Sequence, residues 1–305
     1  MSTTRQGSDG ASPAASAGTT ATTAGMRTGR TAVGEVPIFY RRFGGAGLTP
    51  VLIVHGLSYF SYDWMPVAAA LAQDREVAAL DMRGFGDSGA SPSRDYSVPA
   101  NARDFIAVLD DLRWPRAVLL GHSMGGRHCL YAAATYPARA AALVAVDFAP
   151  AVDPQGAARV ARSVGTQPDT YPSLDACIAA LTGRPAAEAS PAVRRRFEAY
   201  THAVAGGVAI KRDPHFRDQF RRILETGQRP LPGVDLWQAL ASLSCPALFV
   251  RGARSDMFAA ATADKVREAN PRAEVVELPT GHDVGGEDPQ GLVRETLAFF
   301  QRHAL

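Results

Sequence analysis

Four short apolar runs alternate with helix-like segments between about residues 35 and 149, and this alternation limits the possible folds more than any other feature. The runs are Val51 to Val54, Val77 to Leu80, Ala117 to Leu120 and Leu143 to Val146. Each is almost entirely apolar, as expected of a strand covered on both faces. The segments between them carry apolar residues at three- and four-residue spacing over 63–73, 100–113 and 124–136. The pattern predicts an α/β fold with a mostly parallel, doubly wound sheet.

The alternation stops at Pro150 and resumes near Cys245, where residues 246–250 and 273–278 are predicted to form two more strands. The intervening segment is helix-like, is broken by Pro and Gly, and offers no convincing strand. We therefore expect a helical cap at 151–240, inserted into a core built from 34–150 and 241–305.

Residues 1–33 are rich in Ser, Thr, Ala and Gly and lack the apolar region of a secretory signal, so we expect a disordered leader. An untargeted tail, a true start at Met26 and an organelle-targeting peptide all fit this composition. Three cysteines, Cys129, Cys177 and Cys245, show no metal-ligand spacing and are expected to be structural thiols. A cytoplasmic location is the expectation.

The composition bounds the partners of the chain. Its 305 residues are 46% hydrophobic, which is enough for a large core. The net charge of +2 comes from 32 basic and 30 acidic residues, and no stretch gathers the basic ones into a nucleic-acid-sized patch. Apolar runs such as 140–146 are too short to span a bilayer. We expect neither a nucleic acid nor a membrane as partner.

The sequence Gly121-His-Ser123-Met-Gly125 directly follows an apolar strand and directly precedes a helix. This is the context of a nucleophile elbow. So sharp a turn holds the serine in a strained backbone conformation, and flanking glycines avoid Cβ clashes. The N-terminus of the following helix presents free N–H groups, among them that of Met124. Ser123 is the predicted nucleophile, and the Met124 N–H is a predicted oxyanion donor.

With these motifs the chain resembles the α/β-hydrolase superfamily, and in particular its small capped hydrolases. The resemblance is carried by His55-Gly56, by the turn Arg83-Gly-Phe-Gly-Asp-Ser88 and by Gly121-His-Ser-Met-Gly-Gly126. It covers about residues 35–150 and 244–305. It implies that the Leu57 N–H is the second oxyanion donor and that His55 braces this loop.

The resemblance also implies an acid after a late strand and a base after the last one, in the order Ser, acid, His. Asp256 lies six residues past Val250, in the loop where the family carries the acid, and is our choice. Asp147, at the end of the preceding strand, is the alternative, because some relatives place the acid there.

His282, in the sequence Leu-Pro-Thr-Gly-His-Asp-Val, lies after the last predicted strand and is the predicted general base. His303 is close to the C-terminus and is expected to be solvated. Asp283 is adjacent to the base, and adjacent residues seldom turn towards each other well enough to form an orienting hydrogen bond. We interpret it as a loop residue.

Candidate substrate contacts come from two places. An aromatic cluster follows the oxyanion loop and either shapes an apolar pocket wall or packs the next helix: Phe60, Tyr62 and Trp64. Basic residues of the cap are typical of a solvated helix face: Arg194 to Arg196, Lys211-Arg212 and Arg221-Arg222. If one of them points inward, it would pair with a substrate carboxylate, and Arg127, one turn beyond Ser123, is another candidate for that role.

Together these residues predict a serine hydrolase that cleaves an ester, amide or related acyl bond of a small molecule, without a metal or an organic cofactor. Ser123 argues against haloalkane dehalogenases and epoxide hydrolases, which use an aspartate at the elbow. A carbon–carbon bond hydrolase with the same triad and a non-catalytic ligand receptor on this fold stay open. The small-molecule substrate could carry a carboxylate, and either a monomer or a homodimer is admissible.

Overall fold

A computed structural model describes residues 25–33, 36–45, 47–230 and 233–305. In this part of the chain, eight strands form the main sheet in the order β1-β2-β4-β3-β5-β6-β10-β11. Their bounds are β1 Arg27–Val33, β2 Val36–Phe43, β3 Leu48–Val54, β4 Arg75–Leu80, β5 Ala117–His122, β6 Ala140–Val146, β10 Ala247–Gly252 and β11 Ala273–Leu278. The pairs from β4 to β11 are all parallel, and the pairs of β2 with β1 and with β4 are antiparallel.

Strand β1 corrects the predicted boundary of the leader. Residues 27–33 pair with β2 along their whole length, from Arg27 opposite Arg42 to Val33 opposite Val36. An edge strand obtains its hydrogen bonds from one neighbour and needs no apolar run, so it left no signal in the sequence. The rest of the predicted leader, residues 1–24, lies outside the described residues.

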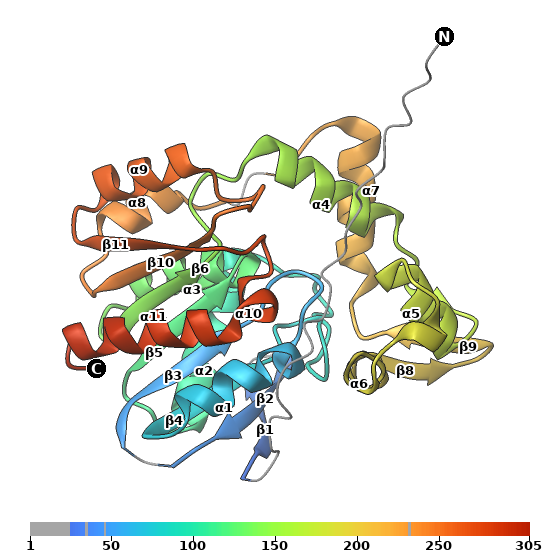
Figure 1. Cartoon of the computed structure of the whole chain (residues 1–305), viewed down its shortest axis with the longest axis horizontal. Helices are drawn as coiled ribbons and strands as arrows, with labels where there is room; N and C mark the ends of the chain where they lie inside the picture. The colour runs from blue at the N-terminus through green and yellow to red at the C-terminus, as the bar shows by residue number, and fades with distance from the viewer. Residues whose placement is uncertain (1–24, 34–35, 46, 231–232) are drawn as a thin grey trace.

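Helices cover both faces of the sheet (Figure 1). Their bounds are α1 Met65–Leu71, α2 Val98–Asp111, α3 Met124–Thr135, α8 Leu236–Ala241, α9 Ala260–Ala269, α10 Val284–Glu287 and α11 Pro289–Arg302, with the 3₁₀ helix η1 at Ser61–Trp64. Side chains of α2, α3, α8 and α9 share one apolar cluster with one face of the sheet. Side chains of α1 and α11 share a second cluster with the other face. Each central strand therefore sends alternate residues into two cores, which explains its nearly continuous apolar sequence.

The cap departs from the helical prediction, because it contains a small three-stranded sheet in the order β7-β9-β8. Its elements are α4 Pro154–Thr166, β7 Thr170–Tyr171, α5 Leu174–Thr182, η2 Ala186–Glu188, α6 Pro191–Tyr200, β8 Thr201–Val204, β9 Gly207–Ile210 and α7 Pro214–Thr226. The strands have only two to four residues, too few for alternation to mark them. Figure 1 shows α4 crossing above the sheet and α5, α6 and β8 beside it.

No helix within the described residues is long and apolar enough to cross a membrane.

A buried ion pair fastens α2 to the turn that follows β4. Arg83 Nε lies 2.6 Å from Asp104 Oδ2, and Arg83 Nη2 lies 2.7 Å from Asp104 Oδ1. Both side chains are buried. The same guanidinium donates to the Asp95 carbonyl oxygen at 2.6 Å. Because a bidentate pair fixes both distance and orientation, it sets where the turn 83–89 lies relative to the sheet.

We expect Asp104→Asn to lower the free energy of unfolding by about 3 kcal/mol, since it leaves a buried guanidinium without its counter-charge. Urea denaturation of the purified protein measures this loss. Asp110→Asn on the same helix is the matched control, because its partner Arg139 and its own exposed carboxylate lie at the surface. That change should cost less than about 1 kcal/mol. Equal effects of the two substitutions would contradict the role given to the buried pair.

Candidate active site

The turn at Ser123 connects β5 to α3 and is strained. Ser123 has a φ of +51°, a region that non-glycine residues rarely occupy. A Cβ on Gly121 would lie 2.5 Å from the Gly125 carbonyl oxygen, and one on Gly125 would lie 2.4 Å from the Val54 carbonyl oxygen. Both positions therefore require glycine. The Ser123 N–H donates to the Val146 carbonyl oxygen at 2.9 Å, which ties the turn to the end of β6.

His282 lies against this serine. The loop after β11 places His282 Nε2 3.0 Å from Ser123 Oγ, within hydrogen-bond range. The imidazole is mostly buried. The arrangement can transfer the hydroxyl proton to the ring when the oxygen attacks an electrophile.

The carboxylate that orients this imidazole belongs to Asp147. Its Oδ2 lies 2.6 Å from His282 Nδ1, and its side chain is fully buried at the end of β6. Two further donors hold it, since the Gly252 N–H donates to Oδ1 at 2.9 Å and the Ser255 hydroxyl donates to Oδ2. Asp147 thus holds the tautomer in which Nε2 can accept a proton.

The choice of Asp256 as the acid is wrong in this geometry. Asp256 turns towards the cap, where Arg159 of α4 binds it through two hydrogen bonds of 2.5 and 2.8 Å. The Arg159 guanidinium holds the pKa of this carboxyl below its usual range. Strand β10 pairs with β6 up to Val250 opposite Val146, and the N–H of Asp147, the residue after β6, donates to the Val250 carbonyl oxygen at 2.7 Å, so Asp147 lies beside the end of β10. The position of Asp147 at the end of a strand was the sequence signal that favoured this alternative.

The two predicted oxyanion donors belong to segments that adjoin the serine. A Cβ on Gly56 would lie 3.3 Å from Ser123 Cβ, so the loop that carries Leu57 passes close to the nucleophile. Met124 is the first residue of α3, and its N–H has no partner within the helix. In the described part of the chain the Leu57 N–H has no hydrogen-bond acceptor either. Both amides are free to receive a developing negative charge.

His55 holds the loop that carries Leu57. Its Nδ1 is 2.7 Å from the Gly56 carbonyl oxygen, and its Nε2 accepts from the Met82 N–H at 2.9 Å. Burial lowers the pKa of this imidazole and so keeps it neutral. A neutral ring can donate from Nδ1 and accept at Nε2 at the same time.

His122 is a site residue that the sequence did not single out. It is almost fully buried, and its Nε2 donates to the backbone carbonyl oxygen of His282 at 2.9 Å. Its ring lies 5.2 Å from that of Tyr59, 5.8 Å from that of Trp64 and 4.8 Å from that of His282, centre to centre. Burial, followed by the charge of His282, lowers its pKa to about 3. A neutral His122 therefore anchors the loop that carries His282.

Asp283 does not compete for the role of acid. Its carboxylate accepts from the Gly286 N–H at 3.2 Å and so caps α10. Burial, and after it the charge of Asp283, raises the pKa of Tyr59. Burial and the nearby Asp63 raise the pKa of Asp283 to about 6.

Two residues of the aromatic cluster, Phe60 and Trp64, are buried, which favours packing over the alternative of a pocket wall. Phe60 has no exposed surface and lies 5.1 Å from the ring of Tyr200 in α6. Trp64 is also buried, beside His122. Tyr62 is partly exposed, and its contact with substrate stays a prediction.

Most basic residues of the cap pair with carboxylates of the protein. Arg196 points inward and binds Asp63 of η1 through two hydrogen bonds of 2.6 and 3.0 Å. Lys211 Nζ lies 2.7 Å from Asp87 Oδ1. Arg127, in contrast, stays partly exposed in the first turns of α3.

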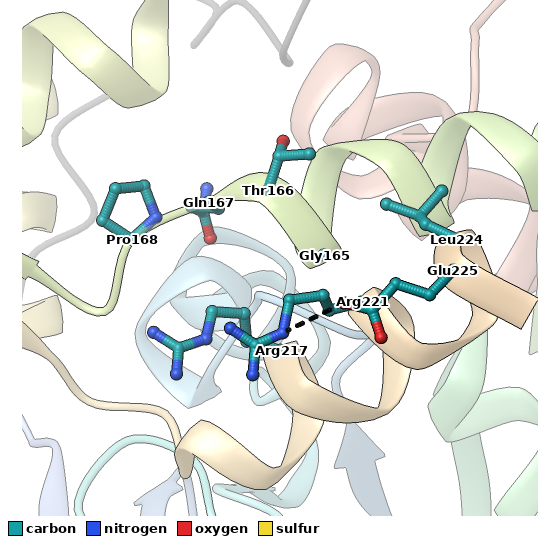
Figure 2. A pocket seen from close by; sticks show the side chains of 8 residues that line it. All are labelled: Gly165, Thr166, Gln167, Pro168, Arg217, Arg221, Leu224 and Glu225. Atoms are coloured by element: carbon teal, nitrogen blue, oxygen red, sulfur yellow. Dashed lines mark ion pairs between the residues drawn. The ribbon is translucent and has the colours of Figure 1, made fainter.

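A groove of about 480 Å³ lies between α4 and α7, on the cap, and does not include the serine (Figure 2). It runs past Gly165, Gln167 and Leu224. Its two arginines are paired, Arg217 with Asp169 at 2.7 Å and Arg221 with Asp218 at 3.2 Å. Nothing in it resembles a reactive centre.

Comparisons with known proteins find a matching family and similar chains. The family described as alpha/beta hydrolase fold matches residues 49–289. The chain is similar to the 2-(acetamidomethylene)succinate hydrolase of Mesorhizobium japonicum, with 28% identity over 271 residues, 88% of this chain and 94% of that protein. It is similar to the esterase YbfF of Escherichia coli, with 27% identity over 249 residues, 81% of this chain and 91% of that protein.

A solved structure shares the arrangement of the backbone. The crystal structure of E-2-(acetamidomethylene)succinate hydrolase superimposes with a TM-score of 0.77 and 27% identity, covering 90% of this chain and 99% of that one.

We expect the imidazole of His122 to stay neutral, with its proton on Nε2, from pH 8 down to pH 5. A pKa lowered to about 3 means that protonation begins only well below this range. The ¹⁵N resonances of the ring, assigned with His122→Gln, report both the tautomer and the charge. A His122 signal that titrates between pH 5 and pH 8, or a proton found on Nδ1, would contradict the hydrogen bond to the His282 carbonyl.

Proposed function

The chain belongs to the α/β-hydrolase fold family, and from this premise we propose that it is a serine hydrolase that cleaves an ester, amide or related acyl bond of a small molecule. The predicted superfamily and fold class are confirmed by the family match and by the solved structure. The observation that carries the proposal is the unbroken line of hydrogen bonds from Ser123 Oγ through His282 to Asp147.

In the first half of the reaction Ser123 Oγ attacks the substrate carbonyl carbon while His282 Nε2 takes the hydroxyl proton. The imidazolium is stabilised by Asp147, and it returns the proton to the leaving group as the acyl bond breaks. Water then attacks the acyl-enzyme, with His282 again acting first as base and then as acid. The N–H groups of Leu57 and Met124 bind the oxyanion in both halves, each contributing about 3 kcal/mol to the transition state.

A substrate that carries a carboxylate is the finer part of the proposal. The name of the similar hydrolase from Mesorhizobium japonicum specifies a succinate, which is a dicarboxylate. Arg127 stands one helical turn from the nucleophile and supplies a cation of the kind that such a substrate needs.

We also propose a cytoplasmic location. Cys129, Cys177 and Cys245 are free thiols, and burial raises the pKa of the Cys245 thiol to about 11. Unreactive, unpaired cysteines fit a reducing compartment.

The serine and the histidine are tested with a fluorophosphonate probe and p-nitrophenyl esters of short and long chain. We expect the parent to be labelled, Ser123→Ala to be unlabelled, and ester turnover to fall by about 10³-fold or more in both Ser123→Ala and His282→Ala. Labelling of Ser123→Ala at the parent's level would refute the nucleophile. A folded parent that is neither labelled nor active would instead favour a ligand receptor on this fold.

The acid is tested by comparing two aspartates of the same region. Asp147→Asn should lower kcat by about 10⁴-fold, because an amide in this place favours the wrong imidazole tautomer. Asp256→Asn is the matched control and should change kcat by less than about tenfold, since its loss breaks only a partly exposed pair with Arg159. The reverse order of the two effects would restore Asp256 as the acid.

A further inference from the structure

The hydroxyl of Ser255 has its direction set by two neighbours. Its Oγ accepts a hydrogen bond from the Met257 N–H at 3.0 Å. A serine hydroxyl has a single proton to donate, and this one is donated to Asp147 Oδ2. The same oxygen of Asp147 lies 2.6 Å from His282 Nδ1. Ser255 therefore acts on the atom that orients the imidazole.

Asp147 depends on such donors. Its side chain is fully buried, and a buried carboxylate is costly unless hydrogen bonds replace the water that it has lost. Its backbone has a φ of +43°, in the left-handed region that favours glycine, so the residue is held in place by its contacts. The Gly252 N–H holds Oδ1 at 2.9 Å. The position of the other oxygen relies on Ser255 and His282.

Helix α4 of the cap rests on the two residues that follow Ser255. The Asp153 N–H, at the start of the helix, donates to the Met257 carbonyl oxygen at 3.2 Å. Three residues on, a Cβ on Gly156 would lie 2.6 Å from Met257 Sδ and closer still to the Asp256 carbonyl oxygen. Only glycine allows the helix to come this close to the loop.

A third contact joins the same two segments. Arg159, three residues after Gly156 and so on the same side of α4, binds both carboxylate oxygens of Asp256. This pair is partly exposed and adds little stability by itself, whereas the packing at Gly156 leaves no gap. Together the three contacts hold the backbone of 255–257 where Ser255 Oγ reaches Asp147.

We propose that Ser255 is a positioning residue of the hydrolase and that helix α4 acts through it, so that the cap helps to hold the acid of the triad. The inference rests on the proposed function and deepens it. The docked helix fixes Met257, the Met257 N–H directs the Ser255 hydroxyl, and this hydroxyl holds Asp147 against the imidazole. A cap that lifts from the loop loosens the general base, although the proposed triad belongs entirely to the core.

The first test measures kcat and KM with the p-nitrophenyl ester that the parent hydrolyses fastest. We expect Ser255→Ala to lower kcat about tenfold and to leave KM within about twofold, because it removes one hydrogen bond to an anion and no substrate contact. Ser255→Thr keeps a hydroxyl and should stay within about threefold of the parent's kcat. Ser242→Ala, which removes an exposed hydroxyl at the end of α8, is the control and should match the parent.

A double-mutant cycle tests whether α4 acts through this hydroxyl. Gly156→Ala pushes a Cβ against 256–257 and should lower kcat about fivefold in the parent, but less than about twofold in Ser255→Ala, where the displaced hydroxyl is already absent. Arg159→Gln forces no atom into the loop and is the milder probe in case Gly156→Ala does not fold. It should lower kcat about twofold in the parent and leave kcat of Ser255→Ala unchanged.

Three results would overturn the inference and leave the serine hydrolase standing. They are a parental kcat in folded Ser255→Ala, a Ser255→Thr as impaired as Ser255→Ala, and effects of the α4 substitutions that are equally large with and without the Ser255 hydroxyl. A folded parent that neither turns over esters nor reacts with the fluorophosphonate would instead overturn the hydrolase itself.

Discussion

The strained turn at Ser123 is the constraint on which the rest of the structure depends. It exists only because Gly125 packs against the backbone of Val54 and Gly121 packs against that of Gly125. Strands β3 and β5 and helix α3 must therefore lie within contact distance at one edge of the sheet. Because the neighbouring strands run parallel, the loops after β3, β6 and β11 open at that same edge. The residues proposed as oxyanion donor, acid and base, Leu57, Asp147 and His282, lie on these loops.

The cap is seated on this edge largely by charge. Arg196 with Asp63, Lys211 with Asp87 and Arg159 with Asp256 each join a cap residue to a core residue. Such pairs gain little net stability, but their geometry is specific. An aromatic contact also joins the cap to the core, because Phe60 of the core lies in the same apolar cluster as the cap residues Phe197 and Tyr200. These directed contacts help to fix the orientation of the cap.

The sequence predicted the features that repeat a strong local pattern. The buried parallel strands were evident because both their faces are apolar, and the elbow was evident because its glycines are indispensable. Strand β1 and the short strands of the cap were missed, because each is held by backbone pairing that leaves no periodic trace. The acid was misplaced because sequence distance does not reveal that Asp147 and the loop after β10 are neighbours in the sheet. His122 was overlooked because its hydrogen-bond partner is a backbone carbonyl oxygen. Every residue has one, so the sequence does not show which of them is the partner.

The position of the acid has an evolutionary consequence. With the serine on the turn after β5 and the carboxylate at the end of β6, two members of the proposed triad lie at the ends of adjacent central strands, where backbone pairing allows little movement. The loop after β10 holds Asp147 through Ser255 and meets α4 of the cap through Asp256. Substitutions in the cap, beyond these contacts, can accumulate without disturbing the reacting atoms. An architecture of this kind can change what it recognises more readily than how it reacts.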